Sequence, residues 1–336
     1  MKLFVTGGAG YIGSHCVLRL LQEGHEVVIF DNFSEGSRET VRTLSELKFP
    51  GRLADVVQGD LLHPEDLQRA LSDDSFDAVF HFAALTRVKE SVQHPELYYC
   101  HNVVGTLNLL EAMRSFDVKR LVFSSTASVY GEPQYTPIDE KHPLNPINPY
   151  GRSKQMAEMI IQDFDRAYGI RSVCLRYFNV VGASSLGCLG DRRVIVTHLI
   201  PSIIHAILGI SKAFSVFGTD YPTRDGTCIR DYIPIEDLVD AHIRALTFLS
   251  EGNRTEIFNL GTEQGYTVQE VLTVCERVLG KKIPVILESR RSGDPAVLIA
   301  ASKRANEALN WHSQQLLEEA IRLAYAWEQK KMSMSL

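Results

Sequence analysis

The chain begins with a short apolar run that ends in a glycine-rich turn, and this turn constrains the fold more than any other feature. Residues 6–13 read TGGAGYIG, with glycines at positions 7, 10 and 13. Glycines at this spacing permit a tight strand-to-helix turn and let backbone N–H groups and a helix N-terminus approach a pyrophosphate. A purely structural turn is the alternative, and the residues beyond the turn decide between the two roles. The residues predicted to contact a dinucleotide here are Gly7, Gly10, Tyr11, Ile12 and Gly13.

Short β-branched runs alternate with amphipathic patterns through the first half of the chain. They predict strands at 2–6, 26–31, 54–58, 78–82, 120–124 and 172–176, and helices at 11–22, 64–71, 103–114 and 150–168. Such alternation is typical of the α/β class, in which a doubly wound parallel sheet of the Rossmann type carries helices on both faces.

The alternation ends near residue 177, and a smaller second lobe is predicted beyond it. A glycine-rich loop at 182–191 precedes an apolar run at 199–210, which is predicted to be a buried helix. Residues 267–270 read TVQE, a capping box, and Gly280 stands where that helix should end. We therefore predict a nucleotide-binding domain over residues 1–178, to which some later segments return, a mixed lobe over 179–330 and a frayed tail over 331–336.

Charge and apolar content exclude several classes of protein. The 336 residues include 35 Lys and Arg against 41 Asp and Glu, and the net charge of −6 does not suit a nucleic-acid-binding surface. The longest apolar run is too short to span a membrane and the N-terminus lacks an export signal, so we expect a cytoplasmic protein. Six scattered cysteines favour buried, reduced thiols, and the spacing of histidines and carboxylates predicts no metal site.

Acidic and small residues at the ends of the next strands favour NAD as the dinucleotide. Asp31 ends the second predicted strand, where its carboxylate can accept hydrogen bonds from a ribose and would repel a 2′-phosphate. Arg38 nearby keeps NADP as the alternative, and Asp60 could cap the next helix instead of meeting the adenine. Further predicted contacts at these strand ends are Asn32, Leu61, Phe82, Ala83 and Ala84.

The fifth strand and the helix after it carry the residues expected to do chemistry. Hydroxyl side chains cluster at residues 124–128, at a strand's carboxyl end, where open α/β sheets bind ligands. Tyr150 and Lys154 lie four residues apart and therefore on one face of a helix. A tyrosine has a pKa of about 10, which a nearby ammonium can lower so that the phenol acts as a base. Such pairs are common on exposed helices, but the position of this one favours a catalytic role.

These features together resemble the extended short-chain dehydrogenase/reductase superfamily. The resemblance implies that Tyr150 is the acid/base, that Lys154 holds the nicotinamide ribose and tunes the tyrosine, and that Thr126 completes the catalytic triad. It also implies that NAD is the cofactor, and it adds Asn102 and Phe178 to the residues that contact NAD.

More specific stretches, above all residues 217–232, resemble the UDP-sugar 4-epimerases of the NAD-dependent epimerase/dehydratase family. The resemblance implies that Arg230 and Arg291 hold the diphosphate of a UDP-sugar and that Asp294 meets the uridine ribose. Arginine forks suit phosphate oxygens, although without the resemblance Arg291 would be taken as surface charge. The other substrate contacts implied are Thr126, Tyr150, Asn179, His198, Leu199 and Phe217.

The activity implied is the reversible interconversion of UDP-galactose and UDP-glucose in galactose metabolism, through a 4-keto sugar and transient NADH. Leu298 aligns with an aromatic residue that excludes N-acetylated sugars in some relatives, so we expect partial activity on UDP-N-acetylhexosamines. Thr86, Lys89 and Val180 depart from the family pattern, which leaves the contacts of the pyrophosphate-side loop and the rigidity of the turn after Asn179 open.

Several alternatives remain open at this point. A nucleotide-sugar 4,6-dehydratase shares Tyr150 and Lys154 but needs an Asp-Glu pair directly after the strand-end threonine, where Ala127 and Ser128 stand. A 4-epimerase of UDP-xylose, UDP-arabinose or a UDP-uronate fits the same motifs. A sensor or scaffold that binds NAD without chemistry is an alternative of another class, against which the retained triad argues. In relatives the helices at 103–114 and from 150 pair across a homodimer, so we expect a homodimer.

Overall fold

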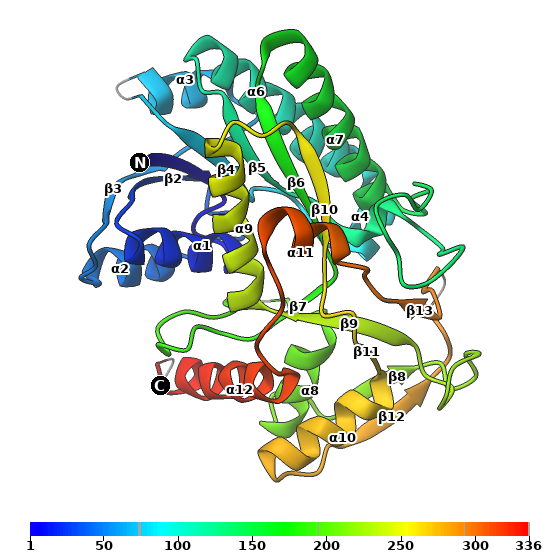
Figure 1. Ribbon diagram of the computed structural model, residues 1–336. Coiled ribbons are helices and arrows are strands. Elements are labelled where there is room, and N and C mark those ends of the chain that lie inside the picture. The colour runs from blue at the N-terminus through cyan, green and yellow to red at the C-terminus, as the bar shows by residue number, and fades with distance from the viewer. Residues whose placement is uncertain (73–74, 194, 292, 335–336) are drawn as a thin grey trace.

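Seven parallel strands form the central sheet of the computed structural model, which describes residues 1–72, 75–193, 195–291 and 293–334 (Figure 1). In chain order they are β1 (Lys2–Thr6), β2 (Glu26–Asp31), β3 (Arg52–Gln58), β4 (Ala78–His81), β5 (Arg120–Ser124), β6 (Arg171–Tyr177) and β10 (Glu256–Leu260). Their order in space is β10-β6-β5-β4-β1-β2-β3. The predicted doubly wound sheet is confirmed, and β10 is a later segment that returns to it.

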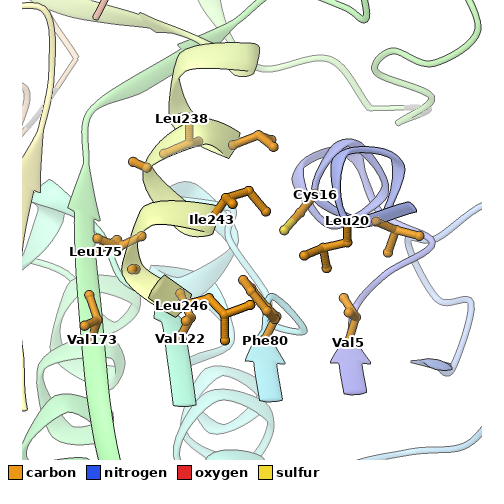
Figure 2. Close-up of a cluster of buried hydrophobic side chains, with 14 of the residues drawn as sticks. Val5, Cys16, Leu20, Phe80, Val122, Val173, Leu175, Leu238, Ile243 and Leu246 are labelled. Carbon is orange, nitrogen blue, oxygen red and sulfur yellow. The ribbon is translucent and has the colours of Figure 1, made fainter. Parts of the chain in front are cut away.

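Helices cover both faces of this sheet, which explains why its central strands are almost continuously apolar. One face carries α1 (Tyr11–Gln22), α2 (Arg38–Glu46), α9 (Ile235–Ser250) and α11 (Lys303–Leu309), and the other carries α3 (Pro64–Ser72), α6 (Gly105–Ser115) and α7 (Pro149–Tyr168). Figure 2 shows Cys16 and Leu20 of α1 and Leu246 of α9 lying over Phe80 and Val122 of the sheet. The two faces bury two separate apolar clusters.

The order of the strands reverses between β1 and β4, which are neighbours in the sheet. From β1 the chain proceeds outward to β2 and β3, and from β4 it proceeds in the opposite direction to β5 and β6. At such a switch point the connections diverge and leave a crevice beyond the carboxyl ends of the strands. The glycine-rich turn follows β1 and residues 82–84 follow β4, so both predicted segments border this crevice.

The second part of the chain builds smaller sheets below the central one in Figure 1. Strand β9 (Ile229–Pro234) pairs with β7 (Asn179–Val181), β11 (Gly265–Thr267) and β13 (Val297–Leu298), while β8 (Phe214–Phe217) pairs with β12 (Val285–Glu288). Helices α8 (Leu199–Ile207), α10 (Val268–Leu279) and α12 (Leu317–Met334) share a third apolar core with these strands. The division of the chain at residue 178 stays a prediction.

Local signals explain where the important helices begin and end. Helix α7 follows Asn148, whose side-chain oxygen accepts a hydrogen bond from the Gly151 N–H at 2.8 Å, and it ends at Gly169 with a left-handed φ of 67°. The predicted capping box is formed: Thr267 Oγ1 accepts from the Glu270 N–H at 3.0 Å, and Gly280 ends α10 at a φ of 63°. No helix within the described ranges is long and apolar enough to cross a membrane.

The structure departs from the predicted elements in several places. Helices α2, α4 (Val88–Gln93) and α5 (Pro95–Tyr98) were not predicted, and a π-helical segment, η1 (Tyr99–Val104), precedes α6, which therefore starts later than predicted. A π-helical turn lacks the 3.6-residue period by which helices are recognised in a sequence. Helix α8 ends before residue 210, α12 extends through Met334 into the expected tail, and Cys100 is exposed rather than buried.

Candidate active site

The glycine-rich turn is packed so closely that Gly7 and Gly13 cannot be replaced without movement of the backbone. Gly7 has a φ of 71°, and a Cβ on it would lie 2.5 Å from the backbone nitrogen of Ala83. A Cβ on Gly13 would lie 2.2 Å from the carbonyl oxygen of Gly7. The turn therefore brings the start of α1 against the loop after β4, as a dinucleotide-binding turn requires.

Asp31, at the end of β2, faces the same crevice and is 7% exposed. Its Oδ2 accepts a hydrogen bond from the Ala9 N–H at 3.0 Å, and its Oδ1 accepts one from the Phe33 N–H at 2.8 Å. Burial raises the pKa of this carboxyl, and the two backbone hydrogen bonds act in the opposite direction. The carboxylate is thus held in place with acceptor capacity left for ribose hydroxyls.

Asn32 and Asp60, which follow the neighbouring strands β2 and β3, are joined by a hydrogen bond beside the crevice. Asn32 Nδ2 donates to Asp60 Oδ2 at 2.9 Å, while Asp60 Oδ1 accepts from the Leu62 N–H at 2.9 Å. Burial opposes ionisation of Asp60, but these hydrogen bonds prevail and lower its pKa. Asp60 therefore orders the turn after β3 and still lines the crevice. Arg38, the residue that kept NADP open, donates instead to Gln58 Oε1 at 2.7 Å.

The cleft at the switch point has the lining that a dinucleotide site requires. Its lining includes backbone from the glycine-rich turn, the carboxylates just described and the small residues after β4: Gly7, Gly10, Asp31, Asn32, Asp60, Leu61, Phe82, Ala83 and Ala84. Tyr11, Ile12 and Gly13 belong to the first turn of α1. A turn that only a glycine backbone can form, beside a buried carboxylate at the end of the second strand, is the arrangement that suits NAD.

Asn102 lies in the π-helical segment η1 and holds the loop after β4. Its Oδ1 accepts from the Leu85 N–H at 2.9 Å, and its Nδ2 donates to the Leu85 carbonyl at 3.0 Å and to Ser153 Oγ at 2.9 Å. The side chain thus connects this loop to helix α7. Its predicted contact with NAD stays a prediction.

Lys154 is buried on α7, with its side chain directed to the end of β5. Its Nζ donates to the Ser124 carbonyl oxygen at 2.9 Å and lies 4.7 Å from the centre of the Phe123 ring. Burial lowers the pKa of Lys154 to about 7. A pKa lowered this far by burial marks Lys154 as a candidate functional residue.

Tyr150 and Thr126 meet at the same place. Burial raises the pKa of Tyr150, and a hydrogen bond with Thr126 acts in the opposite direction. Thr126 also accepts from the Ser128 N–H at 3.1 Å and so caps the short 3₁₀ turn η2 (Ala127–Val129). Ser124, two residues before Thr126, is hydrogen-bonded through its side chain to Tyr177. The three residues of the predicted triad therefore converge at the carboxyl end of β5.

The predicted diphosphate-binding arginines lie in the second lobe. Arg230 on β9 forms an ion pair with Asp294, and its Nη1 also donates to the Ile229 carbonyl at 2.7 Å. The guanidinium of Arg291 stacks over Phe217, 3.7 Å from the ring centre. These contacts join the four residues, all predicted to bind substrate, into two pairs.

The remaining predicted substrate residues lie in segments that follow β6, at the start of β7 and of α8. Asn179 begins β7 and donates through Nδ2 to the Asp231 carbonyl at 3.1 Å, beside Arg230. Burial, with a smaller effect of the Arg193 charge, lowers the pKa of His198 to about 4, so its imidazole is neutral. Leu199 starts α8, and Phe178 packs with Leu298 against the apolar residues after β5. Their contacts with a substrate stay predictions.

Sequence reasoning did not single out a buried ion pair below Lys154. Glu158 Oε2 accepts from Arg176 Nη2 at 2.5 Å, and each side chain is 3% exposed. The position of Glu158, four residues after Lys154 on the same helix, was a signal that could have identified it. Arg176 gave none, because only the sheet brings β6 beside α7.

Comparison with known proteins agrees with this geometry. A model of the family described as "NAD dependent epimerase/dehydratase family" matches residues 3–261. A curated UDP-glucose 4-epimerase from Lactobacillus helveticus is 45% identical over 328 residues, which are 97% of each chain. The crystal structure of a UDP-glucose 4-epimerase from Brucella ovis in complex with NAD is 41% identical, with a TM-score of 0.91 over 96% of this chain and 97% of that one. A UDP-Glc/GlcNAc 4-epimerase from Campylobacter jejuni is 39% identical, with a TM-score of 0.85 over 98% and 99% of the two chains.

Proposed function

The chain belongs to the NAD dependent epimerase/dehydratase family, and from this membership and the site we propose that it interconverts UDP-glucose and UDP-galactose with NAD as its cofactor. It is an epimerase, an isomerase that causes no net oxidation. The observation that carries the proposal is the convergence of Thr126, Tyr150 and Lys154 at the end of β5, next to a cleft that fits a dinucleotide.

Tyr150 is the group that moves the proton. A bound NAD would supply the acceptor, and afterwards the donor, for the hydride at C4 of the sugar. Tyr150 accepts the proton of the sugar O4 hydroxyl and later gives it back. Because burial raises the pKa of Tyr150, its phenolate needs stabilisation, and we assign this role to the Thr126 hydroxyl and to the Lys154 ammonium, which contacts the Ser124 carbonyl at the same strand end. Asp31 and the glycine-rich turn are the residues that would hold NAD.

The second lobe is proposed to hold the UDP group, so that the sugar alone can turn. Arg230 and Arg291 would bind the diphosphate, since guanidinium groups remain charged and match phosphate oxygens in pairs. Asp294, which is already paired with Arg230, would accept a hydrogen bond from the uridine ribose. Fixing the diphosphate lets the oxidised sugar present either face to the same cofactor.

The experiment that tests this function is incubation of the purified protein with UDP-galactose, without added NAD. We expect UDP-glucose as the product, because the cycle regenerates its cofactor. Tyr150→Phe should lower kcat by about 10²- to 10⁴-fold while leaving the bound nucleotide in place. Tyr168→Phe, on the same helix and 41% exposed, is the matched control and should leave kcat unchanged. Unchanged turnover by Tyr150→Phe would refute the assignment.

A second candidate activity is epimerisation of UDP-N-acetylhexosamines. Leu298 is paired with Arg230 in register between β13 and β9, so it lies beside the proposed diphosphate site with a side chain shorter than an aromatic one. The UDP-Glc/GlcNAc 4-epimerase from C. jejuni is similar over nearly the whole chain. We expect UDP-GlcNAc to be converted, and Leu298→Tyr to reduce that conversion with little effect on UDP-galactose. No conversion of UDP-GlcNAc by the wild type would exclude this activity.

A cytoplasmic homodimer remains the proposed form of the protein. Apolar side chains on α6 and α7 are exposed, with Leu107 and Met156 at 38% and Met159 at 59%. Two such helices from each copy would cover these side chains in a four-helix bundle. Light scattering of the eluting protein measures the mass directly, and a mass of one chain at micromolar concentration would contradict the dimer.

A further inference from the structure

Below the proposed triad lies a buried ion pair that the mechanism above does not use. Glu158 is on α7, one turn after Lys154, and Arg176 is on β6. Besides the 2.5 Å contact, Arg176 Nε donates to Glu158 Oε1 at 2.9 Å, and its Nη1 donates to Tyr130 Oη at 3.0 Å. Replacing a buried ion pair by apolar residues often leaves stability unchanged or higher, so stability alone does not account for this pair.

The carboxylate of Glu158 also fixes the end of β5. Its Oε1 accepts a hydrogen bond from Ser125 Oγ at 2.5 Å. Ser125 lies between Ser124, whose carbonyl binds the Lys154 ammonium, and Thr126, whose side chain lowers the pKa of Tyr150. One carboxylate thus holds the strand end that carries both contacts of the triad.

Glu158 is moreover the anion one helical turn from Lys154 on the same side of α7, and its charge favours the ammonium. In the part of the chain that the structure describes, Cys174 on β6 and His81 on β4 also interact with the ammonium. Burial raises the pKa of the Cys174 thiol well above its usual value, and burial together with the Lys154 charge lowers that of His81 to about 3. Both are therefore neutral near pH 7, as is Tyr150 in its resting form. The negative charge that favours the Lys154 ammonium comes from Glu158, and Arg176 offsets part of it.

We propose that Glu158 is a positioning residue for the reaction, whose carboxylate holds the β5 end through Ser125 and serves as the buried counter-charge of Lys154. Arg176 balances it, so that the ammonium is retained without being neutralised as a tight ion pair. This inference rests on the proposed function, because it acts through the roles assigned to Lys154 and Thr126.

The test compares two substitutions that should shift the pH profile of kcat in opposite directions. If the ion pair had only a structural role, the two substitutions would not have opposite effects on this profile. Glu158→Gln keeps an acceptor for Ser125 but removes the negative charge, so Lys154 should lose its proton more readily. Arg176→Gln removes the positive charge that offsets Glu158, so the carboxylate should favour the Lys154 ammonium more strongly and Lys154 should lose its proton less readily. In pH profiles of kcat for UDP-galactose, we expect the alkaline limb to move to lower pH by about one unit in Glu158→Gln and to higher pH in Arg176→Gln.

Controls separate positioning from charge and from misfolding. Ser125→Ala keeps the ion pair and should lower kcat without moving the alkaline limb, while Glu158→Asp keeps the charge and should restore the wild-type limb. Circular dichroism and the nucleotide released on denaturation report folding and cofactor content. If one of the two charge variants does not fold, the direction of the shift in the other decides. No shift, or shifts in the same direction, would overturn the inference. An inactive wild type would instead refute the proposed function.

Discussion

Burial of the Lys154 ammonium must weaken the fold, and this cost should depend on pH in a way that can be measured. The side chain is 3% exposed, and burial lowers its pKa from the ordinary 10.5 to about 7. A gap of about 3.5 pH units corresponds to about 5 kcal/mol of lost stability when the group is charged in both states. The substitution Lys154→Met removes this cost but also the hydrogen bond to Ser124, worth about 1 kcal/mol.

The sign is set by proton binding. Between pH 7 and 10.5 the unfolded chain binds more protons at this site than the folded one, so the stability of the wild type rises with pH. The destabilisation by Lys154 is present in full below pH 7, falls to about 2 kcal/mol at pH 9 and vanishes above the unfolded pKa. The stability advantage of Lys154→Met should therefore shrink by about 2.3 kcal/mol between pH 7, where the folded Lys154 is half-protonated, and pH 9.

Urea unfolding of nucleotide-free wild type and Lys154→Met at both pH values measures this difference, since other titrating groups are common to the two proteins. Removal of nucleotide ensures that unequal NAD binding does not contribute. The variant should also be inactive, so a more stable protein would be a less active one. A stability difference that stays constant or grows from pH 7 to pH 9 would refute a depressed Lys154 pKa.

Two further predictions concern retention of the cofactor. Gly13→Ala would place a Cβ 2.2 Å from the Gly7 carbonyl oxygen, so the turn must open and the purified protein should carry little nucleotide, as measured by absorbance after denaturation; full nucleotide content would contradict this. Arg87, after β4, forms an ion pair with Glu35, which lines the cleft beyond β2. Because this ion pair joins two loops that border the cleft, Arg87→Ala should speed NAD release about threefold in a competition assay, as expected for a partly exposed pair. The control is Arg42→Ala, at an exposed position. Equal release rates in the two variants would show that the Arg87–Glu35 pair does not retain NAD.

Residues that act through local spacing could be predicted from the sequence. The glycines of the first turn, Asp31 at the end of β2 and the Tyr150–Lys154 pair all result from chain-local geometry, since a turn, a strand end and a helix face each involve neighbouring positions. The capping box at Thr267 belongs to the same class. Helix α2 escaped prediction because it is mostly polar and buries only Thr40 and Leu44, and the π-helical segment η1 escaped because it lacks the 3.6-residue period.

The sequence by itself thus determined the fold class, the nucleotide-binding turn and the helix face that carries the proposed chemistry. Only the tertiary structure decided what surrounds that face. The Ser124 carbonyl that holds Lys154, the Arg176 guanidinium that balances Glu158 and the pairing of Arg230 with Asp294 join segments 18 to 64 residues apart. Such contacts depend on sheet order and packing rather than on spacing along the chain. Burial, which brings the Lys154 pKa down to about 7, is likewise a property of the folded molecule alone.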